Sequence, residues 1–315
     1  MEPLVILTGP TAVGKTDISI RLAKKINGEI ISADSIQVYK YMNIGSAKIT
    51  EAEKQGVPHY LIDEFEPDDD FNITVFKKKA LRYMNDIYKK NKIPIIVGGT
   101  AFYIQSVLYN IQFSETKTDY QYRSYLEDLA KEKGPDYIHE MLREVDADSA
   151  DLIHCNNVKR VIRALEFYKE TGTPISKHNS MQRKKSSPYN FAYFVLNDYR
   201  DKLYERIDKR VDSMFEKGLI DEVKSLKAKG YDKSLISMQG IGYKEVFDYL
   251  DGITSLEETR YIIKRETRHF AKRQLTWFKR ERDVSMINYY DFNYDKEKML
   301  SYMTDYLKQK NIIAY

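Results

Sequence analysis

The chain has 315 residues, of which 42% are hydrophobic and 31% charged, as in an ordinary soluble globular protein with one large domain or two modest ones. No apolar run approaches the ~20 residues of a membrane-spanning helix, and an apolar strand begins almost at the first residue. We therefore expect no signal peptide, no membrane association and a cytoplasmic location. Cys155 is the single cysteine, which excludes an internal disulfide and a cysteine-rich zinc site, whereas the net charge of +4 excludes little.

The first predicted elements enclose a phosphate-binding loop. An apolar strand at 4–7 and an amphipathic helix at 17–25 flank the sequence GPTAVGKT, which fits the pattern GxxxxGK[ST] between a strand and a helix. Its glycines let the backbone amides converge on an anion, and the positive end of the helix adds to the field. Lys15 supplies a point charge, and the hydroxyl of Thr16 is a ligand for Mg²⁺. The residues predicted to bind a diphosphate or nucleotide are Gly9, Pro10, Thr11, Ala12, Val13, Gly14, Lys15 and Thr16.

Apolar runs and amphipathic stretches continue to alternate through the first third of the chain. Further strands are predicted at 29–32, 60–62 and 93–97, with a helix at 74–90. A later strand at 193–196 would join the same sheet. This alternation predicts a parallel sheet with helices on both faces, and together with the loop it predicts a P-loop NTPase-like α/β fold.

Polar residues follow the predicted strands at the edge where a parallel sheet binds its ligands. Asp34 could accept a proton or bind a metal ion through water, and it could equally cap a turn. Thr100 offers a small hydroxyl, and it follows Gly98 and Gly99, which permit close approach of the backbone to a ligand. Asp63 could also hold magnesium, although we favour a turn residue at this position.

The pattern becomes helical from about residue 119. Helices are predicted at 120–133, 136–144, 149–154 and 157–170. We interpret 111–190 as an all-helical insertion domain, with the basic segment 177–188 as a mobile part near its end. The P-loop core would comprise 1–110 and 191–315. Its second part is predicted to be mostly helical, at 200–217, 220–229, 242–249 and 256–279.

One of these later helices carries three arginines, Arg200, Arg206 and Arg210. The last two are four residues apart and share a helix face. A phosphate-binding site commonly recruits such arginines to neutralise a leaving group. Equally, they could be surface charges paired with Glu205 and Asp208.

Basic residues gather most densely in the last predicted helix. Nine Lys or Arg and two Glu lie between 260 and 282, with aromatic side chains among them. Positive charge along a phosphate backbone, with aromatics that stack on bases, is a common combination in nucleic-acid-binding proteins. A solvated helix face, with the aromatics in the core, is the plainer alternative. The residues concerned are Lys264, Arg265, Arg268, His269, Phe270, Lys272, Arg273, Leu275, Trp277 and Phe278. Smaller basic clusters are Lys159, Arg160 and Arg163, and Arg183, Lys184 and Lys185.

Taken together, these residues resemble the tRNA dimethylallyltransferases, also called tRNA isopentenyltransferases, and in particular the bacterial members. The resemblance covers nearly the whole chain, and the number, order and spacing of the matching blocks make it specific. Val13 stands where the family usually has Ser, which removes a hydroxyl but leaves the main-chain donors of the loop. The blocks are GPTAVGKT, SADSIQVYKYMNIGSAK, PHYLID, IIVGGTAFYI, IHCNNVKRVIRALEFYKETG, RIDKRVDSMFEKGLIDEV, QGIGYKE and AKRQLTWFK.

The resemblance implies transfer of a dimethylallyl group from dimethylallyl diphosphate to N6 of an adenosine beside the anticodon of tRNA, with release of diphosphate. It implies that Asp34 is the general base on the adenine amine, and that Lys15 and Thr16 with Mg²⁺ hold the diphosphate. Thr100 would contact the reacting groups, and Arg206 or Arg210 would help to neutralise the leaving group. The chemistry is consistent, because a carboxylate assists a poorly nucleophilic amine and a metal-held diphosphate leaves readily.

The resemblance also implies that the partner is a tRNA anticodon stem-loop, whose target adenine must leave its stack to reach the site. We expect the protein to be a monomer. The predicted tRNA contacts are Asp34, Ser35, Ile36, Gln37, Thr100, Arg123, Lys159, Arg160, Val161, Ile162, Arg163, Gln239, Gly240, Ile241, Gly242, Tyr243, Lys244, Lys272, Arg273, Gln274, Trp277 and Lys279.

Three other functions stay open from the residues alone. A small-molecule ATP-dependent kinase would use the same loop and an acid after a neighbouring strand, but it needs neither a long insertion nor a basic helix. A prenyltransferase that acts on free adenine nucleotides would share Asp34 without a tRNA interface. A non-catalytic, nucleotide-controlled RNA-binding module would not depend on Asp34.

Overall fold

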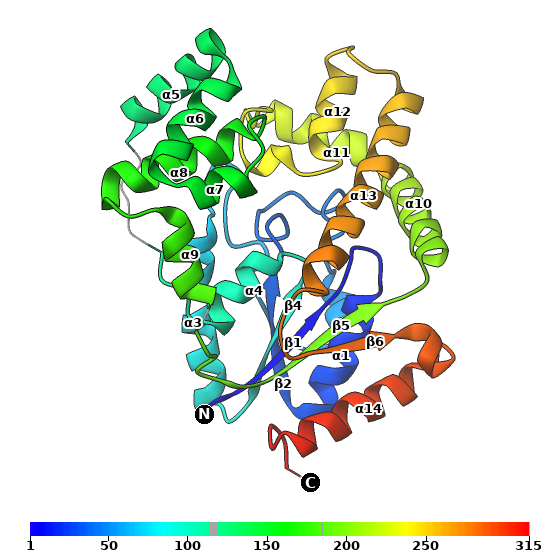
Figure 1. Ribbon diagram of the computed structural model, residues 1–315. Helices are drawn as coiled ribbons and strands as arrows, with labels where there is room; N and C mark the ends of the chain where they lie inside the picture. Colours follow the sequence, from blue (N-terminus) through cyan, green and yellow to red (C-terminus); the bar gives the residue numbers. More distant parts are fainter. Residues whose placement is uncertain (114–118, 184, 315) are drawn as a thin grey trace. The chain divides into compact units, whose positions relative to one another are not determined.

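The computed structural model describes residues 1–113, 119–183 and 185–314. The chain forms two compact units (Figure 1). Unit 1 comprises Met1–Leu108 and Pro188–Tyr315, and unit 2 comprises Tyr109–Ser187. Within the described ranges, no helix combines the length and the apolarity needed to cross a membrane.

Unit 1 is built on a six-stranded sheet in which every strand pairs in parallel with its neighbours, in the order β3-β2-β4-β1-β5-β6. All strands point in the same direction, so their carboxyl ends lie along one side of the sheet, here called its carboxyl edge. Their bounds are β1 Pro3–Thr8, β2 Gly28–Ala33, β3 His59–Tyr60, β4 Ile93–Gly98, β5 Asn190–Asn197 and β6 Val284–Asn288.

Helices cover both faces of this sheet, because its central strands are apolar on both sides. Alternate residues of β1, Val5 and Leu7, join one core with α1 (Lys15–Ile26) and α14 (Lys296–Gln309). On the other face, α3 (Ile73–Lys89) packs with α4 (Ala101–Leu108) against β2 and β4 (Figure 1).

The second half of unit 1 adds a group of helices beyond the sheet. The helix α13 (Leu256–Phe278) is the longest of them and packs against α10 (Arg200–Glu216) and α12 (Tyr243–Leu250). The helix α11 (Leu219–Ala228) packs against α12 and α10. The short elements of unit 1 are α2 Glu51–Lys54 and the 3-10 turns η1 Ser237–Gln239 and η2 Tyr289–Phe292.

The regular secondary structure of unit 2 is all helical among its described residues, and the unit has a core of its own. Leu126, Ile138, Leu142, Val161 and Leu165 are fully or nearly fully buried in that core. The helices are α5 Tyr120–Lys133, α6 Pro135–Val145, α7 Ala147–Leu152, α8 Val158–Thr171 and α9 Ile175–Arg183.

The α/β fold class predicted from the sequence is confirmed, and one local prediction is wrong. The strand expected at 60–62 ends at Tyr60, because Leu61 has a φ of +61°, which a strand does not accommodate. The first part of the basic segment 177–188 belongs to α9, and its predicted mobility stays a prediction. Lys184 of that segment lies outside the described residues. The sequence prediction also missed α4, β6 and α14.

Candidate active site

The predicted phosphate loop crosses the carboxyl end of β5 as it leaves β1. Gly9 has a φ of +148°, and a Cβ placed on it would lie 2.5 Å from the carbonyl oxygen of Leu196. Glycine is required at this position, since any side chain would collide with the β5 main chain. The loop leads through Gly14 into α1, and the Lys15 amine donates to the carbonyl oxygens of Gly9 and Pro10, each at 2.9 Å.

The charges of Arg210 and Asp34 both act on Lys15, although the three residues are separate in the sequence. Burial and the positive charge of Arg210 lower the pKa of the Lys15 amine to about 8, against the opposing effect of the Asp34 carboxylate. Burial also lowers the pKa of Arg210, and Asp34 again opposes the shift. Three of the predicted site residues therefore form one group of charges at the carboxyl edge of the sheet.

Asp34 follows β2 and uses one of its two oxygens to shape the chain. Its Oδ1 accepts from the backbone N–H groups of Ile36 at 2.9 Å and Gln37 at 3.2 Å. The turn-capping interpretation is therefore confirmed for this oxygen. Oδ2 accepts no hydrogen bond from the described part of the chain, so the capping role leaves it available for chemistry.

Thr100 lies beside the end of β2, since its N–H donates to the carbonyl oxygen of Ala33 at 3.2 Å. The two glycines before it, Gly98 and Gly99, lie close to other parts of the protein. A Cβ on Gly98 would lie 2.2 Å from the Ala33 carbonyl oxygen, and one on Gly99 would lie 2.2 Å from Nε2 of Gln274. The space that we expected a ligand to use is therefore taken by β2 and by α13.

Gln274 joins α13 to both the phosphate loop and the end of β4. Its Oε1 accepts from the N–H of Thr11 at 2.9 Å, and its Nε2 donates to the carbonyl oxygen of Gly99 at 3.0 Å. The residue is 6% exposed. The side chain of Gln274 thus holds the loop in place, and its predicted contact with tRNA stays a prediction.

Arg206 also touches the phosphate loop, and it pairs with a buried carboxylate that the sequence did not point to. Its Nε donates to the carbonyl oxygen of Ala12 at 3.2 Å, and its Nη2 forms an ion pair with Asp198 Oδ2 at 2.8 Å. The alternative, in which the arginines of α10 pair with Glu205 and Asp208, is wrong. Glu205 pairs with Lys209 at 2.6 Å, and Asp208 pairs with Arg268 at 2.6 Å.

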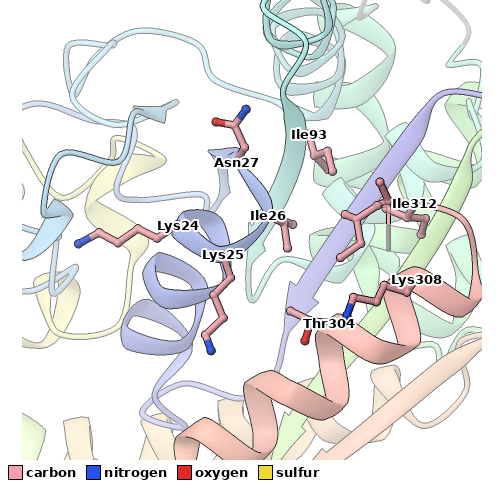
Figure 2. A pocket seen from close by; sticks show the side chains of 10 residues that line it. Lys24, Lys25, Ile26, Asn27, Ile93, Thr304, Lys308 and Ile312 are labelled. Atoms are coloured by element: carbon pink, nitrogen blue, oxygen red, sulfur yellow. The ribbon is translucent and has the colours of Figure 1, made fainter.

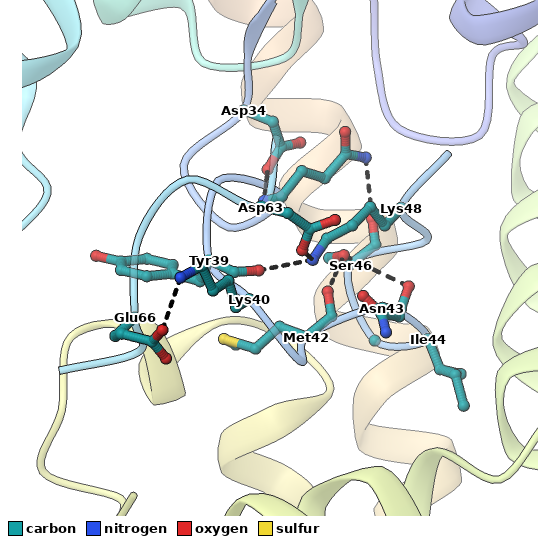
Figure 3. A network of polar contacts seen from close by, with 12 residues as sticks. Asp34, Tyr39, Lys40, Met42, Asn43, Ile44, Ser46, Lys48, Asp63 and Glu66 are labelled. Carbon is teal, nitrogen blue, oxygen red and sulfur yellow. Dashed lines mark hydrogen bonds and ion pairs between the residues drawn. The ribbon is translucent and has the colours of Figure 1, made fainter. Parts of the chain in front are cut away.

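The loop that follows Asp34 is fixed by its own polar side chains (Figure 3). Gln37 donates from Nε2 to the carbonyl oxygens of Ser46 and Ala47 at 3.2 and 3.3 Å. Lys48, whose side chain is 4% exposed, donates to the carbonyl oxygen of Tyr39 at 2.6 Å and pairs with Asp63. Burial lowers the pKa of the Lys48 amine. Asp63 has a φ of +55°, so it is the turn residue that we favoured.

A carboxylate from α11 completes this loop. Glu222 accepts from the N–H groups of Asn43 and Ile44 at 2.8 Å and of Gly45 at 3.1 Å. It also accepts from the Tyr243 hydroxyl at 2.8 Å, and Tyr243 is fully buried. Tyr243 and Gly242 are therefore buried in this structure, and their predicted contact with tRNA stays a prediction.

The basic helix α13 divides into paired and exposed charges. Lys264 pairs with Asp212 at 2.7 Å, and Arg268 pairs with Asp208, so this part of the helix is neutralised by α10. The remaining predicted tRNA contacts of the helix and its C-cap are exposed: Lys272, Arg273, Trp277 and Lys279.

In unit 2 the predicted tRNA contacts separate in the same way. Arg123 forms a two-point contact with Glu166, from Nε at 2.8 Å and from Nη2 at 2.7 Å. The side chains of Val161 and Ile162 fill the core of the unit, and the predicted contact of these two residues with tRNA stays a prediction. Lys159, Arg160 and Arg163 are exposed on α8.

A groove of about 600 Å³ lies at the other end of the strands, away from the phosphate loop (Figure 2). It lies beside the end of α1 and the start of β4, and all ten of its lining residues are outside the predicted site. Its lining residues are Lys24, Lys25, Ile26, Asn27, Ile93, Thr304, Lys308, Ile312, Ile313 and Ala314.

Comparison with known proteins places this chain in a family. The model of the IPP transferase family matches residues 37–281. A protein of Lachnoclostridium phytofermentans called tRNA dimethylallyltransferase is 59% identical over 313 residues, covering 99% of this chain and 100% of the relative. A protein of the same name from Acetivibrio thermocellus is 52% identical over 307 residues, covering 98% of each.

The chain is also similar to solved structures of proteins with related names. The full-length tRNA isopentenylpyrophosphate transferase of Bacillus halodurans has a TM-score of 0.74 at 42% identity and covers 99% of this chain and 98% of its own. A eukaryotic dimethylallyltransferase acting on tRNA has a TM-score of 0.79 at 32% identity, over 91% of this chain and 74% of its own. The chain therefore belongs to the IPP transferase family.

Proposed function

We propose that this protein transfers the dimethylallyl group of dimethylallyl diphosphate to N6 of an adenosine beside the anticodon of tRNA and releases diphosphate. The similar proteins are called tRNA dimethylallyltransferases, and one similar structure is of an enzyme acting on tRNA. The observation that carries the proposal for this chain is the group formed by Lys15, Arg210 and Asp34. It sets a phosphate-binding loop beside a carboxylate that retains one oxygen.

In this proposal the loop binds the diphosphate of the donor. Negative charge grows on the diphosphate as the C–O bond breaks, and fixed positive groups stabilise that charge. Lys15 would exchange its contacts to Gly9 and Pro10 for contacts to phosphate oxygens. Arg206, at the loop carbonyl of Ala12, and Arg210 would add two further cations.

The chemistry of the donor set fits a magnesium ion that the diphosphate itself largely holds. Thr16 is exposed in the first turn of α1 and offers a hydroxyl. Among the described residues, no group of three or more His, Cys, Asp or Glu could hold a metal ion. Mg²⁺ commonly takes one or two protein ligands together with substrate phosphates, and when bound it would neutralise charge on the leaving group.

Asp34 would act on the acceptor. The N6–C bond forms as the C–O bond of the donor breaks, and the proton of the amine passes to the Asp34 carboxylate. Because Oδ1 already accepts two backbone N–H groups, the oxygen that receives the proton is Oδ2. Thr100, whose N–H is bound to Ala33, would contact the reacting groups through its hydroxyl.

The tRNA would be bound by exposed cations and aromatics. On α13 these are the residues not neutralised by α10, and on α8 they are the exposed basic cluster. Phosphate contacts give affinity without regard to sequence, while stacking on Trp277 suits an unpaired base. The side chains that would bind tRNA are Lys159, Arg160, Arg163, Lys272, Arg273, Trp277 and Lys279.

We also propose that the protein acts as a monomer in the cytoplasm.

The test is to supply Mg²⁺ and tRNA that lacks the modification, with either dimethylallyl diphosphate or ATP, and to measure the released product. Release of diphosphate that needs both the prenyl donor and tRNA would support the proposal. If a small acceptor replaces tRNA, formation of ADP from ATP, with no diphosphate from the prenyl donor in either case, would instead indicate a kinase.

A further inference from the structure

We infer that Asp198 is a positioning residue of the diphosphate site, acting through Arg206, an inference that rests on the proposed function. Asp198 directly follows β5, and its side chain is fully buried. A carboxylate in such a place needs a compensating charge or hydrogen bonds. For Asp198 the compensating charge is the guanidinium of Arg206.

The partners of Asp198 lead directly to the phosphate loop. Its Oδ1 accepts from the N–H of Tyr199 at 2.8 Å and from the hydroxyl of Tyr294 at 2.9 Å. Its Oδ2 faces Nη2 of Arg206 at 2.8 Å, and that oxygen makes no hydrogen bond within the described residues. One oxygen is thus fixed by the fold, and the other depends on the guanidinium alone.

Arg206 in turn spans the distance from Asp198 to the loop. Its Nε donates to the carbonyl oxygen of Ala12, a loop residue with a φ of +62°. A left-handed conformation at a non-glycine residue is costly and persists only where surrounding contacts hold it. These contacts engage Nε and Nη2, and in the described part of the chain Nη1 makes no hydrogen bond or ion pair. Arg206 therefore holds the loop through Nε, is itself held through Nη2, and retains Nη1 as a donor for a phosphate oxygen.

The position of Asp198 follows from the sheet. β1 and β5 pair with Thr8 opposite Val195, so Asp198 lies just beyond the edge at which the loop leaves β1. The loop passes so close to β5 that a Cβ on Gly9 would meet the Leu196 carbonyl. Asp198 is thus placed to hold the Arg206 guanidinium against the loop.

A purely structural ion pair is the competing explanation, and it makes a different prediction. Buried ion pairs are often no more stabilising than apolar side chains of the same size, and a structural pair would affect unfolding alone. If Asp198 acts through Arg206, its removal should weaken diphosphate binding only when Arg206 is present. Such dependence is what a double-mutant cycle measures.

The experiment uses the full chain and inorganic diphosphate with Mg²⁺ as the probe, titrated by calorimetry. The variants are Asp198→Asn, Asp198→Ala, Arg206→Ala and the double variant D198N/R206A. Asp201→Asn, an exposed acid of the same region, is the matched control. We expect Asp198→Asn and Arg206→Ala each to weaken binding about tenfold, and the double variant to bind as Arg206→Ala does. The Asp201→Asn protein should bind as the parent does.

The isosteric Asp198→Asn variant keeps the acceptor for Tyr199, so it decides the matter if Asp198→Ala fails to fold. Losses that multiply in the double variant would overturn the inference. Tighter binding by Asp198→Asn would also overturn it, because the carboxylate would then act merely as a repelling charge. In the transfer reaction we expect kcat to fall with the KM for tRNA unchanged. A parent protein that binds diphosphate but transfers nothing to tRNA would refute the proposed function, and the binding cycle would still test Asp198.

Discussion

Lys15 is less firmly charged in the free protein than an exposed lysine is, since the pKa of its amine is lowered to about 8. A bound diphosphate stabilises the protonated amine and so raises this pKa. Affinity for diphosphate should therefore be fully present below about pH 7 and decline as the pH rises through 8.

The measurement is calorimetric titration of inorganic diphosphate with Mg²⁺ at several pH values, on the parent and on Lys15→Met. The variant should bind more weakly, and its affinity should lack the pH dependence that the amine causes. An identical pH dependence in both proteins would show that the effect comes from another group, or from the diphosphate itself.

Asp34 offers a sharper test of chemistry at the scale of one atom. Asn in its place keeps an oxygen that can accept from Ile36 and Gln37, so the turn should survive, but the amide cannot take a proton. Asp34→Asn should lower kcat at least about 100-fold. Its tRNA affinity, measured by filter binding, should stay within about twofold of the parent. A variant that keeps the parental kcat would remove Asp34 from the role of base.

At the scale of elements, Glu222 ties α11 to the 43–45 loop by accepting three backbone N–H groups. Glu222→Gln places a donor where an acceptor is needed, so at least one of these N–H groups, which are half-buried at Ile44 and Gly45, loses its acceptor. We expect a loss of about 1–3 kcal/mol in the free energy of unfolding, measured in urea. Asp221→Asn, at an exposed neighbouring position, is the control and should change little. Equal effects of the two substitutions would contradict the account.

The division of α13 into paired and exposed cations predicts two different phenotypes. Arg273→Ala should weaken tRNA binding and reduce the slope of log affinity against log salt by about one unit. Arg268→Ala should leave that slope unchanged and lower stability, because the Arg268 side chain is paired with Asp208. The measurement is tRNA binding over a range of KCl concentrations. A shallower slope for Arg268→Ala would mean that this ion pair opens to bind tRNA.

Local patterns could predict most elements, and their failures have physical reasons. α5 was predicted at 120–133, where an acidic N-cap and a following Gly-Pro mark its ends. β6 was missed because it is an edge strand whose side chains are mostly half-buried, with Ile287 alone buried, so it shows no apolar run. α14 does carry buried residues at helical spacing, Met299, Met303 and Leu307, and that signal was available in the sequence.

At the scale of the whole molecule, the long-range contacts are what the sequence could not provide. The loop motif and the rule that ligands bind at the carboxyl edge pointed to Lys15 and Asp34. The partners Asp198 and Gln274 could not be found in this way, because an isolated Asp or Gln carries no local pattern. Gln274 is 263 residues from Thr11, to which it is bound.

Unit 2 has its own buried core, which predicts that it folds without the rest of the chain. A fragment of residues 109–187 should show a helical circular dichroism spectrum and a cooperative thermal transition. A fragment that melts without cooperativity would show that its core depends on contacts with unit 1.

The central claim is the transfer of a dimethylallyl group to tRNA. The measurement that tests it most directly is mass analysis of nucleosides from unmodified tRNA after incubation with the protein, Mg²⁺ and dimethylallyl diphosphate. The account predicts that one adenosine of the anticodon loop gains the mass of one dimethylallyl group, and that this gain disappears with Asp34→Asn. Unchanged adenosine with the parent protein, under conditions in which the protein binds both diphosphate and tRNA, would contradict it.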